Sequence, residues 1–171
     1  MDIIAVKVEP AQAASLSLPR VEYRWDADTD ILTATMNGGA KGQGMSGSVG
    51  IEGADGSWLI FDVSGGRIAG VEVAVWPDVR KVQELPLPAD TAPGFVSIPS
   101  RPSQPGIASL EIDTRLVADA DPAERTIHFR FGAPRPVRAV RVGEDLILDI
   151  DAADHIAGVW LLNVPPFPSD Q

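Results

Sequence analysis

The sequence lacks cysteine, long hydrophobic runs and an excess of basic residues. Without cysteine the chain cannot form disulfides, thiolate nucleophiles or cysteine-based zinc and iron–sulfur sites. No segment approaches the roughly 18 consecutive apolar residues of a membrane-spanning helix. Residues 1–8 lack the basic region and the long apolar run of a signal peptide. We therefore expect a soluble cytoplasmic protein with no membrane partner.

Acidic residues outnumber basic ones, at 24 against 14, which gives a formal net charge of −10. A protein that binds nucleic acid has to neutralise phosphates with lysine and arginine, so we expect no nucleic-acid partner. The negative charge is divided evenly along the chain. Residues 1–76 hold ten acidic and five basic side chains, and residues 107–171 hold eleven and six. An acidic surface is also an ordinary source of solubility.

The even charge accompanies an internal repeat. The quartet Ile-Ala-Gly-Val at residues 68–71 recurs at residues 156–159, and an apolar stretch containing aspartate precedes each copy. A repeat unit of about sixty residues buries little surface by itself, so two copies gain by packing against each other. The repeat predicts two similar β lobes, related by approximate twofold symmetry and packed as one body.

Apolar and mixed positions alternate with a period of two, as in residues 71–76 and 126–131, which indicates half-buried antiparallel strands. The sequence therefore predicts an all-β, mainly antiparallel fold with little or no helix; only residues 10–16 could form a helical turn. Gly65 and Gly66 predict a tight hairpin turn, and Asp151 and Asp154 predict its counterpart. The predicted strands are 3–8, 20–25, 31–36, 46–51, 57–63 and 67–76 in the first copy, and 107–113, 125–131, 136–142, 145–151 and 155–163 in the second.

Seven prolines fall within residues 77–106. Proline cannot donate a hydrogen bond to a β-ladder, so this stretch is predicted to be a connector. It separates a first repeat (1–76) from a second (107–171). Its apolar residues, such as Leu85, indicate that it lies along the body of the protein.

Two stretches, residues 23–32 and residues 61–73, resemble the prokaryotic family called domain of unknown function 2283. The pattern is an aromatic and Asp-rich turn, an apolar strand, then an apolar–Asp pair, a glycine turn and Ile-x-Gly-Val-Glu-Val. The second copy fits in residues 148–151 and 156–159 but has Trp160 in place of the glutamate. The resemblance implies a tandem pair of such units and a β fold. It implies no activity.

No convincing catalytic constellation is present. Asp62 and Glu72 are predicted to face each other across the first hairpin, where a partly buried pair could do acid–base work. The second copy has Asp149 and Trp160 at the corresponding positions, so only the first copy could keep such a site, and a turn-capping role for Asp62 is favoured over catalysis. We predict no catalytic residue.

Metal or cofactor binding is not predicted either. The Asp26-Ala27-Asp28-Thr29-Asp30 turn has the alternating carboxylates that open a calcium loop, but it lacks the later glycine and glutamate. The two histidines, His128 and His155, follow no metal-binding spacing and are expected at the surface or at strand edges.

Arginines gather in the second copy. His128 and Arg130 share a strand face and Arg138 lies on the next strand, so these residues could form a cationic strip for an acidic partner or a second subunit. Pairing with nearby carboxylates is the alternative. Among the tryptophans, Trp58 is predicted in the core. Trp25, Trp76 and Trp160 are predicted at strand ends or on the mixed face, where they could serve a protein interface or the contact between the lobes.

The leading hypothesis is thus a non-enzymatic binding or assembly module that acts through protein contacts or self-association, with edge strands suited to β-augmentation. The alternative is a small-molecule or carbohydrate-binding β domain, or a hydrolase, with a cleft between the lobes. That cleft would be lined by Trp76, Trp160, Asp62 and Glu72.

Overall fold

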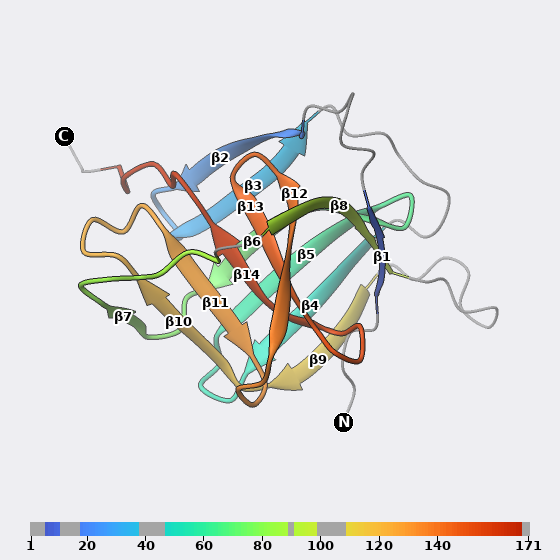
Figure 1. Cartoon of the computed structure of the whole chain (residues 1–171). Coiled ribbons are helices and arrows are strands. Elements are labelled where there is room, and N and C mark those ends of the chain that lie inside the picture. Colours follow the sequence, from blue (N-terminus) through green and yellow to red (C-terminus); the bar gives the residue numbers. More distant parts are fainter. Residues whose placement is uncertain (1–5, 11–17, 38–46, 89–90, 99–108, 169–171) are drawn as a thin grey trace.

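The chain folds into β-strands joined by turns and loops (Figure 1). A computed structural model describes residues 6–10, 18–37, 47–88, 91–98 and 109–168. Within these ranges the structure contains no helix, as predicted, and hence no helix that could cross a membrane. The residues of the predicted helical turn, except Pro10, lie outside the described part, and Pro10 ends a strand.

The first repeat forms five strands that pair in the order β2-β3-β6-β5-β4, each antiparallel to its neighbour. The order puts β6 at the centre, with the hairpin partner β5 on one side and β3 on the other. The strands are β2 (Arg20–Asp26), β3 (Ile31–Asn37), β4 (Gly47–Gly53), β5 (Trp58–Ser64) and β6 (Arg67–Val75).

The second repeat pairs its strands in the same order, β10-β11-β14-β13-β12, and again every pair is antiparallel. The two copies of the sequence motif therefore have equivalent strand pairings, while the twofold relation between them stays a prediction. The strands are β10 (Leu116–Ala120), β11 (Ile127–Phe131), β12 (Val137–Gly143), β13 (Leu146–Asp151) and β14 (Ile156–Leu161).

Among the described residues, the four strands outside these two sets pair within and between the repeats. β8 (Thr91–Ser97), which follows the first repeat, pairs in parallel with β12 of the second. β9 (Ser109–Thr114) pairs in parallel with β4 of the first repeat. β7 (Val79–Lys81) lies parallel to β10, and β1 (Lys7–Pro10) lies antiparallel to β8. The fourteen strands of the described ranges thus form one curled sheet with both parallel and antiparallel pairs.

Most predicted strands are confirmed, but β7, β8 and β10 were not predicted. Two of them lie in the proline-rich stretch, which sequence reasoning treated as a connector. β8 contains a single proline, Pro93, opposite Arg141 of β12, so the rest of the strand can still pair.

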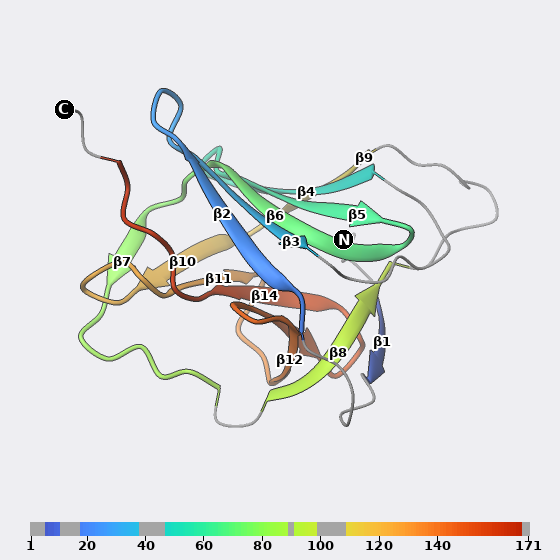
Figure 2. The ribbon, with the colours of Figure 1, turned by 90° about the horizontal axis from the view of Figure 1, so that it is seen from above.

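The hydrophobic core lies between the two repeats, whose strands face each other in Figure 2. Phe61 of β5 and Phe131 of β11 meet edge to face across it, with ring centroids 5.8 Å apart. The prediction that Trp58 belongs to this core was wrong. Because Leu59 and Phe61 point inward, Trp58 points outward, where it is 38% exposed and lies against Gly50.

The proline-rich segment after β7 covers the outer side of the second repeat. Figure 2 shows it passing on the side of β14 and β12 that faces away from the first repeat. Its Leu85 packs against a small second cluster formed by Ile147, Trp160 and Leu162. This cover explains why every residue of β13 and β14 is buried.

Candidate functional site

The candidate site lies on the outer side of the second repeat, away from the main core. In a strand, alternate side chains point to opposite faces, so Phe129 enters the core while His128 and Arg130 point outward. The register places His128 beside Asp119 of β10 and Trp160 of β14. Side chains from β10, β11 and β14 therefore meet on one face of the sheet.

A buried aspartate organises the centre of this face. Asp149 of β13 is only 3% exposed. One carboxylate oxygen lies 2.7 Å from Nε2 of His128, and the other accepts a hydrogen bond from Nε1 of Trp160 at 3.3 Å. Since a carboxylate can only accept, Nε2 of His128 carries the proton in this contact. The His128 ring stacks on the Trp160 indole, with centroids 3.8 Å apart and an interplanar angle of 10°.

Gly158 makes room for the aspartate. It is the register partner of Asp149, and a β-carbon placed on it would lie 2.7 Å from the Asp149 carboxylate and 2.5 Å from the carbonyl oxygen of Phe129. Such distances are too short for any side chain. The glycine of the repeated quartet thus permits the close approach that sequence reasoning expected, and here it admits a functional group as well.

A second carboxylate, Asp119, holds two arginines. Arg130 of β11 donates to it at 2.8 Å, and Arg80 of β7 donates through Nε at 3.1 Å. Asp119 is 8% exposed, so the pairs are partly desolvated. The Nε atom of Arg130 is buried and has no hydrogen-bond partner among the described residues. Asp119 therefore fixes the Arg130 guanidinium while leaving part of its donor capacity unused.

A third arginine forms the wall of the site through the loop after β11. Arg135 donates to Asp151 at 2.8 Å and to the carbonyl oxygens of Phe131 and Ala133. Asp151 is buried, which opposes its charged form. Hydrogen bonds from Arg135 and from the backbone amides of His155 and Ala153 outweigh this cost and hold the pKa of Asp151 below its usual value. The predicted turn role of Asp151 is confirmed by these amide contacts.

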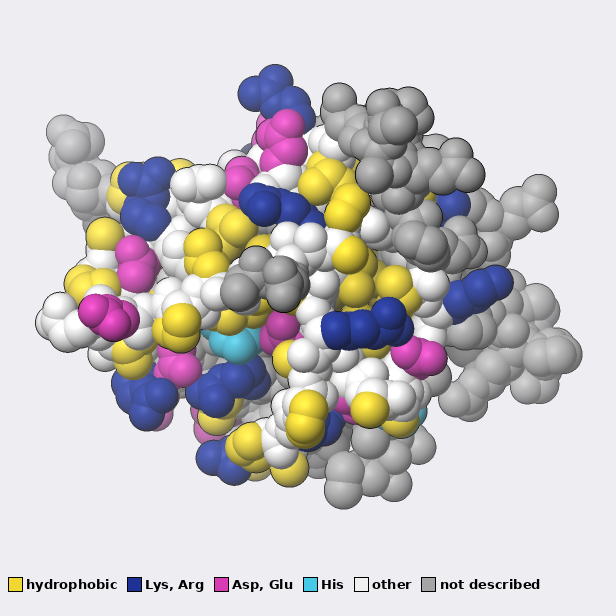
Figure 3. All heavy atoms as spheres, in the orientation of Figure 1, with side chains coloured by type: hydrophobic (Ala, Val, Ile, Leu, Met, Phe, Trp, Pro, Cys, Tyr) yellow, Lys and Arg dark blue, Asp and Glu magenta, His cyan; other side chains and the backbone are white. Residues whose placement is uncertain are grey.

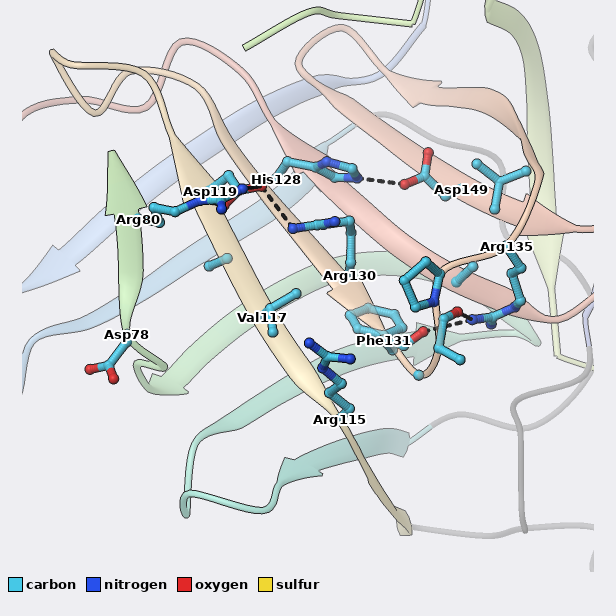
Figure 4. Close-up of a pocket in the computed structure, with 16 residues that line it drawn as sticks. Asp78, Arg80, Arg115, Val117, Asp119, His128, Arg130, Phe131, Arg135 and Asp149 are labelled. Carbon is cyan, nitrogen blue, oxygen red and sulfur yellow. Dashed lines mark hydrogen bonds and ion pairs between the residues drawn. The ribbon is translucent and has the colours of Figure 1, made fainter. Parts of the chain in front are cut away.

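These residues surround a hollow of about 390 Å³, the first pocket (Figure 4). Four arginines and three aspartates line it, so its formal charge is +1 on a protein of −10. Arg115 directly precedes β10 and is exposed, and its side chain forms no hydrogen bond or ion pair with the described residues. The lining residues are Asp78, Arg80, Arg115, Val117, Ala118, Asp119, His128, Arg130, Phe131, Gly132, Ala133, Pro134, Arg135, Val137, Asp149 and Ala157.

A second pocket of about 840 Å³ adjoins the first and shares His128, Asp149 and Val137 with it. Its wall is mostly apolar and comes from the proline-rich segment, β8, β12 and Trp160. In Figure 3 a histidine is visible in a recess bordered by basic and hydrophobic side chains. The remaining lining residues are Val8, Pro86, Pro88, Thr91, Ala92, Pro93, Arg138, Ala139, Val140 and Trp160.

The structure brings together three of the predicted contact residues, Trp160, His128 and Arg130. The expectation that His128 lies at the surface or at a strand edge was wrong, because its side chain is 14% exposed on an interior strand. Trp160 lies outside the main core near the end of β14 and is 5% exposed. Arg138 lines the second pocket and pairs with Asp154 at 2.9 Å. The predicted cationic strip is thus divided between two pockets, and its arginines are largely paired with carboxylates.

The other predicted residues lie elsewhere. Trp76 stacks on Trp25 and donates to the carbonyl oxygen of Asp30. Asp62 and Glu72 lie on the outer side of the first repeat as diagonal neighbours, because Glu72 is the register partner of Ile60, two residues before Asp62. Burial raises the pKa of both carboxyls, and the charge of Asp62 raises that of Glu72 further. The Asp62 side chain makes no hydrogen bond with a described residue.

Sequence reasoning did not assign Asp149, Asp119, Arg80 or Arg115 to a site. One signal was available for Asp149: it aligns with Asp62 in the repeat, and its neighbours Trp160 and His128 have no counterparts in the first copy. Arg80 carried no signal, because its partner strand β10 is nearly forty residues away in the chain.

No protein-family model matches the sequence, and no curated protein is significantly similar to it. The resemblance to domain of unknown function 2283 stays a prediction.

Proposed function

We propose that this protein is a non-enzymatic binding module for a small anionic ligand, which occupies the first pocket. One observation carries the proposal: four arginines converge on a hollow in a strongly acidic protein, and two of them keep unused donors. This corresponds to the small-molecule alternative derived from the sequence, at a location within the second repeat.

Guanidinium groups suit carboxylate and phosphate because their donors form a planar fork that can contact two oxygens at once. Arg115, the residue before β10, is a diagonal neighbour of Arg130 on β11, since Val117 is the register partner of Arg130. Such neighbours are roughly 7–8 Å apart, which lets one anion bridge them. Asp119 holds Arg130 in place before the ligand arrives, and this lowers the entropy lost on binding.

The composition of the pocket favours binding over covalent catalysis. Among the described residues that line it there is no serine, threonine, cysteine, lysine or tyrosine to act as a nucleophile. The Nε2 atom of His128 is already engaged by Asp149. In this arrangement the His128–Asp149 pair serves as a rigid wall.

Isothermal titration with inorganic phosphate, sulfate, citrate and acetate at low ionic strength tests the proposal. Arg115→Ala removes an exposed side chain, so the fold is retained. A charge-assisted hydrogen bond contributes about 1.5–3 kcal/mol, and Arg115→Ala should weaken anion binding roughly 10- to 100-fold. Arg24→Ala is the matched control, because Arg24 is an exposed arginine on β2 of the first repeat. Absence of binding by every anion, or equal weakening by both variants, contradicts the proposal.

A second candidate function, assembly through protein contacts, is favoured by a different surface. Trp58 and Val75 are register partners on β5 and β6 and are 38% and 48% exposed. Exposed aromatic side chains are enriched at protein interfaces. If this surface mediates self-association, light scattering will show a mass that rises with concentration, and Trp58→Ser will abolish the rise. A constant monomer mass for the unmodified chain counts against self-association.

A further inference from the structure

The first and second pockets adjoin each other and differ in chemical character. They share His128, Asp149 and Val137 as lining residues, so the two pockets meet at the His128–Asp149 pair. The first pocket carries a formal charge of +1. The second contains one arginine, Arg138, and the shared Asp149, so its formal charge is zero.

The second pocket is built to receive an apolar group. Its walls carry prolines from the connector and aliphatic residues from β12, and the Trp160 indole contributes to its floor. The charged group nearest to this floor is Asp149, whose two oxygens are satisfied by His128 and Trp160. An apolar chain that enters therefore meets no unpaired carboxylate. Arg138 is held by Asp154 at the exposed rim, where both side chains are more than half exposed.

We propose, on the basis of the anion-binding function above, that the ligand is an amphipathic anion. Its carboxylate or similar acidic head contacts Arg115 and Arg130, and its hydrocarbon body lies in the second pocket against Trp160 and the connector prolines. The adjacency of the two pockets and the difference in their charge select this class over a compact, fully polar anion. Two adjoining pockets of these sizes can enclose most of the surface of such a small ligand.

A series of straight-chain alkanoates, from acetate to decanoate below their micelle concentrations, tests the ligand class by titration calorimetry. Affinity should rise roughly 2- to 4-fold for each added methylene until the second pocket is filled. 1-Octanol, which has the chain without the charge, should bind at least 10-fold more weakly than octanoate.

Two variants test separately how the acidic head and the hydrocarbon body of the ligand contribute to binding. Ala139→Phe fills the second pocket from β12, and it should abolish the chain-length dependence while leaving acetate and phosphate binding unchanged. Arg115→Ala should weaken all alkanoates by the same factor and keep the dependence. If Ala139→Phe does not fold, Ala92→Trp blocks the same pocket from an exposed position on β8.

The outcomes distinguish this inference from the proposed function. If phosphate and acetate bind through Arg115 but chain length has no effect, the amphipathic ligand is wrong and the anion site stands. If no anion binds, the proposed function fails, and binding of octanol equal to octanoate would likewise remove the role of the charge. If filling the pocket instead lowers the mass of a dimer in light scattering, the occupant is a second copy of the chain and the inference is overturned.

Discussion

The two repeats contain the same aspartate–glycine pair and use it differently. Asp62 faces Gly70 on β5 and β6, and Asp149 faces Gly158 on β13 and β14, with a register irregularity directly after each aspartate. Asp149 is 3% exposed, and both of its oxygens are bonded. The Asp62 side chain is exposed at one side, is only partly desolvated, and has no hydrogen-bond partner among the described residues.

The neighbours of each pair explain the difference. Glu72 stands in the first repeat where Trp160 stands in the second, and Thr33 stands where His128 does. Glu72 repels Asp62, whereas Trp160 and His128 donate to Asp149. The connector then covers Trp160 through Leu85. The same strand pairing thus holds a solvated acidic pair in the first repeat and a buried polar cluster in the second.

The largest effect is expected from filling the glycine positions. Gly158→Ala places a β-carbon against both the Phe129 carbonyl and the Asp149 carboxylate, and it should lower the free energy of unfolding by about 3 kcal/mol. Gly70→Ala meets the Ala34 carbonyl at 2.7 Å but clears the Asp62 carboxylate at 3.5 Å, and it should cost about 1.5 kcal/mol. Urea unfolding followed by circular dichroism measures both. Equal losses would show that the aspartate does not constrain the glycine.

Replacing the aspartates should give the next largest difference in stability between the two repeats. Asp149→Ala leaves the ring N–H groups of His128 and Trp160 without partners and should cost about 2.5 kcal/mol. Asp62→Ala removes an unbonded, partly desolvated charge and should leave stability unchanged within about 0.5 kcal/mol. The same urea titrations give both values, and a loss of similar size in Asp62→Ala would contradict the assigned difference.

Lowering the pH should decrease the free energy of unfolding through Asp151 of the second repeat and increase it through Glu72 of the first. The folded pKa of Asp151 lies below its ordinary 3.8, so its contribution is complete above about pH 4 and is lost as the pH falls through the folded pKa. Asp151→Asn should lower stability by about 1.5 kcal/mol at pH 7 and flatten this acid-side loss. Urea midpoints between pH 2 and pH 7 measure the profile. Unchanged curvature in the variant would exclude Asp151 as its source.

The smallest effect is expected from Glu72. Its pKa is raised above 4.5 by burial and by Asp62, so its charge destabilises the fold as the pH rises through the folded pKa. Glu72→Gln should stabilise the protein by about 0.5 kcal/mol at pH 7 and have no effect at pH 3. Glu52→Gln replaces an exposed residue on β4 of the same repeat, so it is the matched control and should change neither value.

Local features of the sequence predicted much of the fold. The period of two located β5 and β11 to within two residues, and the glycine pair predicted the turn in which Gly65 and Gly66 adopt φ values of 57° and 81°. The strand β8 escaped prediction because its pairing with β12 is parallel and long-range. A parallel partner leaves no turn signal in the sequence.

The candidate site was predicted only in fragments. His128 and Arg130 could be placed on one face because strand alternation is a local rule. Their partner Asp149 lies about twenty residues away in the chain, and Arg80 reaches Asp119 only because β7 pairs with β10.

The sequence by itself determined that this protein is built of β-strands, that its two halves carry the same motif, and that two glycines stand where backbones approach closely. These properties depend on residue type and spacing. Tertiary structure alone decided that β8 and β9 cross between the repeats, that the connector covers Trp160, and that arginines from β7, β10 and β11 meet around one hollow. Such arrangements depend on which distant strands pair, and the free energy of that choice comes from the packing of the whole molecule.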